Sequence, residues 1–317
     1  MSDRQHTPTT PTLVTIMSTG YAALNRRLWV LVIPVAMNMV IGWGSRLSFA
    51  PFFSLHYDQV SSLAALTSRD PDHQKELIAY LQNADMRRLL AGYRFIPTLP
   101  DAVLYRGGLW SGQTTLVWSL GGALISAVSI NLLTLLASSF FLTALTSAVT
   151  ADPGTSPSPG IPIPSVWETL VVAVRLASYL LLLAMGVLAA GLPSLILSIL
   201  MVREFPLLAT PLFLGWFVLW FWFSVFTGFG IEAMLVSRVG PVQAVLRSVR
   251  LVRHHLLGAL GLVVLSMLIT SGLGVIWSAL AQHPAGLAVA MGGSAYIGSG
   301  LVAARLVFYR ERWGRMR

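Results

Sequence analysis

Long apolar runs, separated by shorter polar segments, divide most of this chain. A helix that crosses a membrane needs about 20 mostly apolar residues. The runs that are long enough are residues 28–49, 115–149, 168–202, 207–236, 256–281 and 286–309. The pattern predicts an all-α fold: a polytopic membrane helical bundle with about six transmembrane helices, forming a single membrane domain over residues 26–317.

Two segments lie outside these runs. Residues 1–25 are polar and rich in Thr and Pro, and they lack the basic start and cleavage site of a signal peptide, so we expect a disordered cytoplasmic leader. Residues 50–113 are expected to form an extracytoplasmic helical loop. Within it, residues 71–92 predict a helix, because Pro71 suits a first turn and Gly92 a stop. This helix is interpreted as a cap on the outer membrane surface or as a substrate-facing lid.

Basic residues in the short loops orient the bundle, because cytoplasmic loops carry an excess of Lys and Arg. One group follows residue 236 and another forms the C-terminus: Arg238, Arg247, Arg250 and Arg253, then Arg310, Arg312, Arg315 and Arg317. Both groups are cytoplasmic if the N and C termini are cytoplasmic. The loop 50–113 carries six Lys and Arg residues but also six acids, and loops of about 60 residues largely escape this rule.

A parallel internal repeat relates two parts of the chain. Residues 165–188 align without gaps on residues 240–263, and the repeat units extend over about 165–202 and 240–281. An apolar stripe with helical spacing occurs in both copies, as Trp167, Leu170, Val171 and Val174 and as Val242, Val245, Leu246 and Val249. Copies that run in the same direction need an even number of spans between them, which agrees with cytoplasmic termini.

Each copy also begins with a signal for a helix start. Ser165 and Glu168 have the spacing of a capping box, and Gly240 followed by Pro241 places proline in a first turn. The second copy carries a basic side opposite its apolar stripe, which predicts an amphipathic interfacial helix. Its candidate headgroup-binding face consists of Arg247, Arg250, Arg253 and His254.

The segment GPVQAVLRSVRLVRHHLLG carries a Gly-Pro entry followed by Ala244, Ser248, Arg250, Leu251 and Arg253. It resembles a pattern in bacterial multi-span domains, including the membrane domain attached to some glycerophosphodiester phosphodiesterases. The segments RRLWVLVIPVAMNMVIGWGSRLS and GGSAYIGSGLVAARLVFYRER are similar to uncharacterised bacterial six-span membrane proteins. The resemblance implies a multi-pass protein of the bacterial cytoplasmic (inner) membrane. It implies no catalytic residues, because a phosphodiesterase domain would be a separate soluble barrel.

Composition supports the membrane assignment and excludes several kinds of site. The 317 residues are 55% hydrophobic and 10% charged, with a mean hydropathy of +0.73, whereas soluble domains carry about a quarter charged residues. There is no cysteine, which excludes disulfides, thiolate metal sites and cysteine nucleophiles. The net charge is +9, and the arginines that produce it cluster beside the apolar runs. We therefore expect anionic lipid headgroups rather than nucleic acid as the partner of these arginines.

The candidate chemistry is sparse. No phosphate-binding loop, nucleophile elbow or zinc-protease motif occurs, so we predict no catalytic, cofactor-binding or metal-ligating residue. Glu232 and Arg305 lie inside predicted spans and are interpreted as a possible interhelical ion pair. Their role is either structural or that of a proton or substrate relay. Asn38 and Asn131 are expected to hydrogen-bond between helices. Small-residue spacings predict close helix approach at Gly186/Ala190, Ser294/Gly298 and Gly300/Ala304.

These patterns favour a non-enzymatic membrane component, which would be a scaffold, an accessory protein or a regulatory protein. Its partners would be the lipid bilayer, anionic lipid headgroups and an unknown protein partner. A transporter or permease for a lipid-like or amphiphilic substrate is the alternative, favoured by the parallel repeat and by prolines within the spans. A membrane-embedded enzyme that acts on lipid is a third hypothesis.

Overall fold

The computed structural model describes residues 11–43, 46–48, 50–56, 95–99, 114–116, 119–151, 163–204 and 209–316, together with Asp72, Lys75, Glu76, Ala79 and Leu207. Two compact units make up the chain. The first unit comprises Met1–Leu31, Ser139–Val275 and Tyr296–Arg317. The second unit comprises Val32–Ser138 and Ile276–Ala295. Three helices, α8, α13 and α14, contribute residues to both units.

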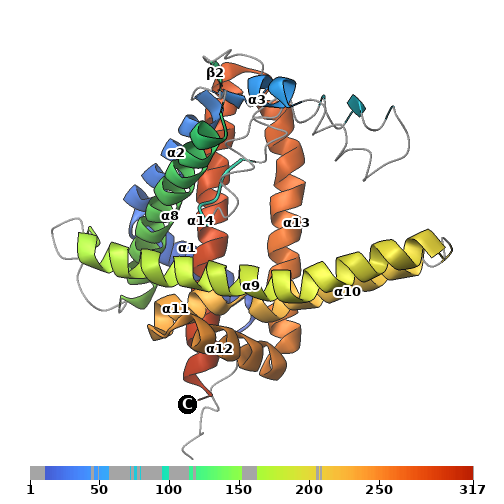
Figure 1. Ribbon diagram of the computed structural model, residues 1–317. Helices are drawn as coiled ribbons and strands as arrows, with labels where there is room; N and C mark the ends of the chain where they lie inside the picture. The colour runs from blue at the N-terminus through green and yellow to red at the C-terminus, as the bar shows by residue number, and fades with distance from the viewer. Residues whose placement is uncertain are drawn as a thin grey trace, which may run out of the picture. The chain divides into compact units, whose positions relative to one another are not determined.

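Within the described residues, five helical segments are long and apolar enough to cross a membrane (Figure 1). They are α8 (Leu120–Thr150), α9 (Val166–Glu204) as far as Ser194, the pair α10 (Ala209–Thr227) and α11 (Gly230–Ser237), α13 (Leu256–Leu280) and α14 (Pro284–Gly314). A sixth candidate is a bent pair, Leu13–Asn25 with Leu28–Ile41. The predicted fold class, an all-α multi-pass membrane bundle, is therefore confirmed.

The N-terminal region differs from its prediction. Helix α1 (Leu13–Asn25) occupies part of the segment expected to be a disordered leader. The polar Thr residues obscure an apolar stripe at positions 16, 20, 23 and 24, all of which are buried. Thr12 caps this helix, because its hydroxyl accepts a hydrogen bond of 3.3 Å from the backbone N–H of Thr15.

The first predicted span is also shorter than expected. Residues 28–49 were predicted as one helix, but a 3₁₀ turn, η1 (Leu28–Leu31), precedes α2 (Val32–Trp43). Strand β1 (Arg46–Ser48) then pairs with β2 (Thr114–Leu116). Apolar residues continue to position 49, but the helix ends where the chain begins this strand pairing.

In the first unit, α1 packs closely on the C-terminal half of α14. A Cβ atom on Gly20 would lie 2.6 Å from the backbone nitrogen of Ala304, and one on Gly300 would overlap the Tyr21 ring. The Tyr21 hydroxyl donates a 3.1 Å hydrogen bond to the carbonyl of Ile297. The close approach predicted from Gly300/Ala304 is thus confirmed. The prediction for Gly186/Ala190 is wrong, because a Cβ on Gly186 would meet nothing within 4 Å.

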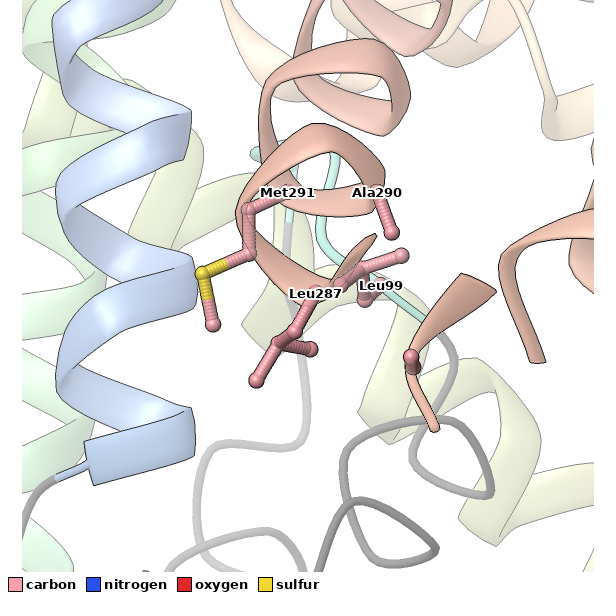
Figure 2. Close-up of a cluster of buried hydrophobic side chains, with 5 residues drawn as sticks. Leu99, Leu287, Ala290 and Met291 are labelled. Atoms are coloured by element: carbon pink, nitrogen blue, oxygen red, sulfur yellow. The ribbon is translucent and has the colours of Figure 1, made fainter. Parts of the chain in front are cut away.

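The second unit contains a small apolar core, shown in Figure 2. It consists of Leu99, Ala281, Leu287, Ala290 and Met291, with Trp277 packed against it. Asn38 is fully buried in this unit, and its side-chain oxygen accepts a 2.8 Å hydrogen bond from the backbone N–H of Leu99. Its partner is therefore the loop 95–99 rather than a neighbouring helix.

The predicted helical loop at 50–113 lies mostly outside the described residues. It begins with α3 (Ala50–Leu55). Of the predicted helix at 71–92, Asp72, Lys75, Glu76 and Ala79 are described, and all are helical. Lys75 and Asp72 form an exposed ion pair of 3.2 Å.

The glycine at position 20 offers a test of the α1–α14 contact. We expect Gly20→Ala to lower the free energy of unfolding by about 1–3 kcal/mol, because the added methyl group must displace the α14 backbone. The matched control is Gly186→Ala, which adds the same atom in open space. Thermal unfolding in detergent should separate the two variants, and equal midpoints would contradict the close approach.

Candidate functional site

The fourth predicted span is interrupted. Residues 207–236 were expected to form one helix, but α10 ends at Thr227 and α11 begins at Gly230. Gly228 and Gly230 lie at the interruption. Only proline has a lower helix propensity than glycine. We use the name α10–α11 break for residues 226–229, which are the last two residues of α10 and the two residues that follow it. The two glycines in TGFGIE are the signal from which it could have been predicted.

Ser248 forms hydrogen bonds with backbone groups at both ends of the break. Its hydroxyl donates a 2.6 Å hydrogen bond to the carbonyl of Phe226 and accepts a 3.1 Å hydrogen bond from the N–H of Phe229. Ser248 is fully buried and belongs to α12 (Pro241–His254). Because a buried backbone group without a hydrogen bond is costly, the freed groups of the break need such an internal partner.

Two further side chains bind the next carbonyls of the break. The Tyr179 hydroxyl, from α9, donates a 2.7 Å hydrogen bond to the carbonyl of Thr227. The guanidinium group of Arg305, from α14, donates to the carbonyl of Gly228. Side chains from α9, α12 and α14 therefore hold the break together.

The ion pair predicted from sequence lies beside the break. Arg305 Nε is 2.7 Å from Glu232 Oε1, and the side chains are 33% and 6% exposed respectively. Glu232 lies in the first turn of α11, where the helix dipole favours a negative charge. Arg305 also lies over the ring of Phe229, 5.3 Å from its centre. One guanidinium group thus binds both a carbonyl of the break and the carboxylate that follows it.

The two copies of the repeat hold the break from different helices. Tyr179 comes from the first copy and Ser248 from the second, and α9 and α12 pack against each other. Figure 1 shows α11 and α12 running beside α9. Buried positions recur in the same register, as Thr169, Ala173 and Leu176 and as Ala244, Ser248 and Leu251. The predicted repeat therefore has equivalent buried sides in both copies.

The predicted helix starts are confirmed. The N–H of Glu168 donates to the Ser165 hydroxyl at 3.1 Å, and the N–H of Ser165 donates to the Glu168 carboxylate at 3.4 Å. Gly240 is the N-cap of α12, with Pro241 in its first turn. The copies then diverge, because α9 continues as one helix whereas α12 ends at His254, before α13 begins.

The outer surface of α12 is apolar near the start of the helix and basic near its end. Val242 and Leu246 are 58% and 63% exposed, while Arg250, Arg253 and His254 are also exposed. The first copy likewise exposes its apolar stripe, with Trp167 at 74%. The two copies thus share the same pattern: one side of each helix is buried, and the apolar stripe predicted from sequence lies on the surface.

One residue of the predicted headgroup-binding face is placed differently. Arg247 is half-buried, and its guanidinium group lies 5.2 Å from the centre of the Trp313 ring. It therefore contacts the end of α14. Nearby, burial and the positive charges of Arg312, His254 and Arg315 lower the pKa of His255 below its ordinary value of 6.5. The exposed basic residues of α12 are accordingly Arg250, Arg253 and His254.

The remaining predicted polar residue forms no interhelical hydrogen bond. The Asn131 side chain is exposed and donates at 2.8 Å to the carbonyl of Ala127 in its own helix. Among the described residues, no group of three or more His, Asp or Glu side chains could hold a metal ion. Sequence reasoning missed Tyr179, which resembles any other aromatic residue of an apolar run.

Comparisons with protein-family models, curated proteins and solved structures find no match to this chain.

Replacing Arg305 tests the ion pair. We expect Arg305→Gln to destabilise the protein by about 2–5 kcal/mol, toward the lower end because a third of the side chain is exposed. Glu232→Gln should cost less, since the freed Arg305 still reaches solvent. The double variant should be more stable than the sum of the single effects predicts, because each single change leaves one charge unpaired.

The control for these variants is Glu311→Gln. Glu311 pairs with Arg310 at 3.5 Å, and both side chains are 37% exposed, so its removal should change the unfolding free energy by less than about 1 kcal/mol. Additive effects of the Glu232 and Arg305 changes in a double-mutant cycle would show that the pair has no energetic significance.

Proposed function

We propose that this chain is a non-enzymatic, multi-pass component of the bacterial cytoplasmic membrane, with a scaffold, accessory or regulatory role. The outer surface of α12, placed at the cytoplasmic headgroup layer, binds anionic lipids. The observation that carries this proposal is the exposed surface of α12, which has apolar residues near its start and basic residues near its end. Both termini are proposed to be cytoplasmic, in agreement with the arginine distribution and with the resemblance to bacterial six-span membrane proteins.

The geometry of α12 supports an interfacial position. A helix in the headgroup plane keeps apolar side chains toward the acyl layer and basic side chains toward the phosphates. Val242 and Leu246 supply the first kind of side chain, and Arg250, Arg253 and His254 the second. Each arginine near an anionic surface contributes about 1 kcal/mol of attraction. The opposite side of α12 is occupied by its contacts with the break.

The placement of the ion pair supports a structural rather than a relay role. Glu232 and Arg305 bind each other, and Arg305 also binds the carbonyl of Gly228. Both groups are thereby engaged in holding α11 to α14. A proton or substrate relay would need one of them to exchange partners during each cycle.

One observation favours the alternative, a transporter for an amphiphilic substrate. Transporters bind substrates at discontinuous helices, and the α10–α11 break interrupts a candidate span. Here the carbonyls of the break are bound by the protein's own side chains. Proteoliposomes containing the purified chain distinguish the two functions. Scrambling or uptake of a fluorescent phospholipid, abolished by Glu232→Gln, would replace the scaffold proposal with the transporter.

Single cysteines test the placement of α12, because the natural chain contains none. Spin labels at Val242→Cys and Leu246→Cys should be accessible to oxygen dissolved in the acyl layer. Labels at Gln243→Cys and Arg250→Cys should instead be accessible to a water-soluble nickel reagent. A reversed or uniform pattern would overturn the interfacial position.

The same variants test the orientation of the protein. A membrane-impermeant maleimide should label Arg250→Cys in inverted vesicles and leave it unlabelled in right-side-out vesicles. Labelling only in right-side-out vesicles would place α12 on the opposite side of the membrane.

A further inference from the structure

One arginine of the first copy of the repeat has no counter-charge among the residues that the structure describes. Arg175 is half-buried in α9, inside the candidate span Val166–Ser194. In the part of the chain that the structure describes, no ion pair or hydrogen bond joins the Arg175 side chain to another group. A charged side chain in an apolar span is costly unless something compensates its charge.

Arg175 borders a hollow whose other walls are apolar. From α9 the walls are Val172 and Leu176, and from α11 they are Ile231, Met234 and Leu235. The hollow is shallow, with a volume of about 10 Å³, which is the space of about one water molecule. An acyl chain therefore lies across the apolar rim of the hollow, beside a single cation, and not inside it.

We propose that Arg175 and the apolar rim of this hollow bind one anionic phospholipid of the bilayer. Its phosphate accepts hydrogen bonds from the Arg175 guanidinium group, and part of one acyl chain lies against the half-buried side chains of Val172, Ile231 and Leu235. Arginine suits this contact because its planar fork of donors matches phosphate oxygens. A free phosphate ion would satisfy the arginine but would leave the apolar walls uncovered, so a lipid fits the surroundings better.

The second copy of the repeat shows what the proposed site adds to a simple basic surface. Arg250 is the repeat equivalent of Arg175, and it is exposed on α12. It is not part of the hollow between α9 and α11. Arg250 therefore contributes to the diffuse attraction of headgroups, whereas Arg175 together with the apolar walls holds one lipid. The inference rests on the membrane location of the chain and not on the scaffold role.

The test is native mass spectrometry of the full chain, with phosphatidylglycerol and phosphatidylcholine of identical acyl chains added in titration. The wild type should retain one phosphatidylglycerol molecule in preference to phosphatidylcholine. Arg175→Gln should weaken this binding at least tenfold, because a charge-assisted contact is lost. The matched control Arg250→Gln should leave the tight site unchanged and reduce only the weaker association of further lipids.

A second pair of variants tests the apolar wall. Leu235→Trp should fill the hollow and weaken retention of the lipid, whereas Leu181→Trp, on an exposed part of α9, should not. Thermal unfolding confirms that each variant is folded.

Equal phosphatidylglycerol binding by the wild type and Arg175→Gln would overturn the proposal, and so would displacement of the lipid by inorganic phosphate alone or selective retention of a fatty acid. Loss of lipid preference in Arg250→Gln but not in Arg175→Gln would leave the α12 face standing and remove this site.

Discussion

Backbone groups that are freed at a helix break and buried need hydrogen-bond partners within the protein, and this requirement organises the first unit. At the α10–α11 break, three successive carbonyls are bound by Ser248, Tyr179 and Arg305. Each of these side chains comes from a different helix, so satisfying the break also joins α9, α12 and α14 to one another. Glu232 binds Arg305 in turn, which fixes the start of α11. The contacts that stabilise the local chain geometry of the break are therefore also the contacts that hold the helices together.

The duplicated helix gains its role from this arrangement. One side of each copy is buried toward its neighbours, and the opposite apolar stripe is exposed, as at Trp167 and Val242. A buried side that holds the break and an outer side that suits the lipid interface are compatible on one amphipathic helix. This division is compatible with the proposed scaffold, accessory or regulatory role. The proposed lipid site at Arg175 extends the same logic, because its walls come from α9 and from α11, the helix that the break positions.

Periodicity and charge predicted the membrane fold, the helix starts and the repeat, because each depends on residues close together in sequence. They also selected Glu232 and Arg305, since charges are rare in apolar runs. The α10–α11 break was not predicted, because the surrounding residues are apolar enough to read as one continuous span. Tyr179 was missed for a related reason: its hydrogen bond depends on where a distant carbonyl lies. The burial of α1 likewise depends on contacts with α14 that local polarity does not reveal.

Hydrogen exchange at the break, followed by mass spectrometry of the protein in lipid nanodiscs, tests the central claim most directly. The amide of Phe229 should exchange slowly in the wild type, because it donates to the buried Ser248 hydroxyl. Ser248→Ala should speed exchange in peptides that cover residues 226–232 and leave the middle of α13 unchanged. Fast exchange at the break in the wild type, or exchange unaffected by the substitution, would contradict the account.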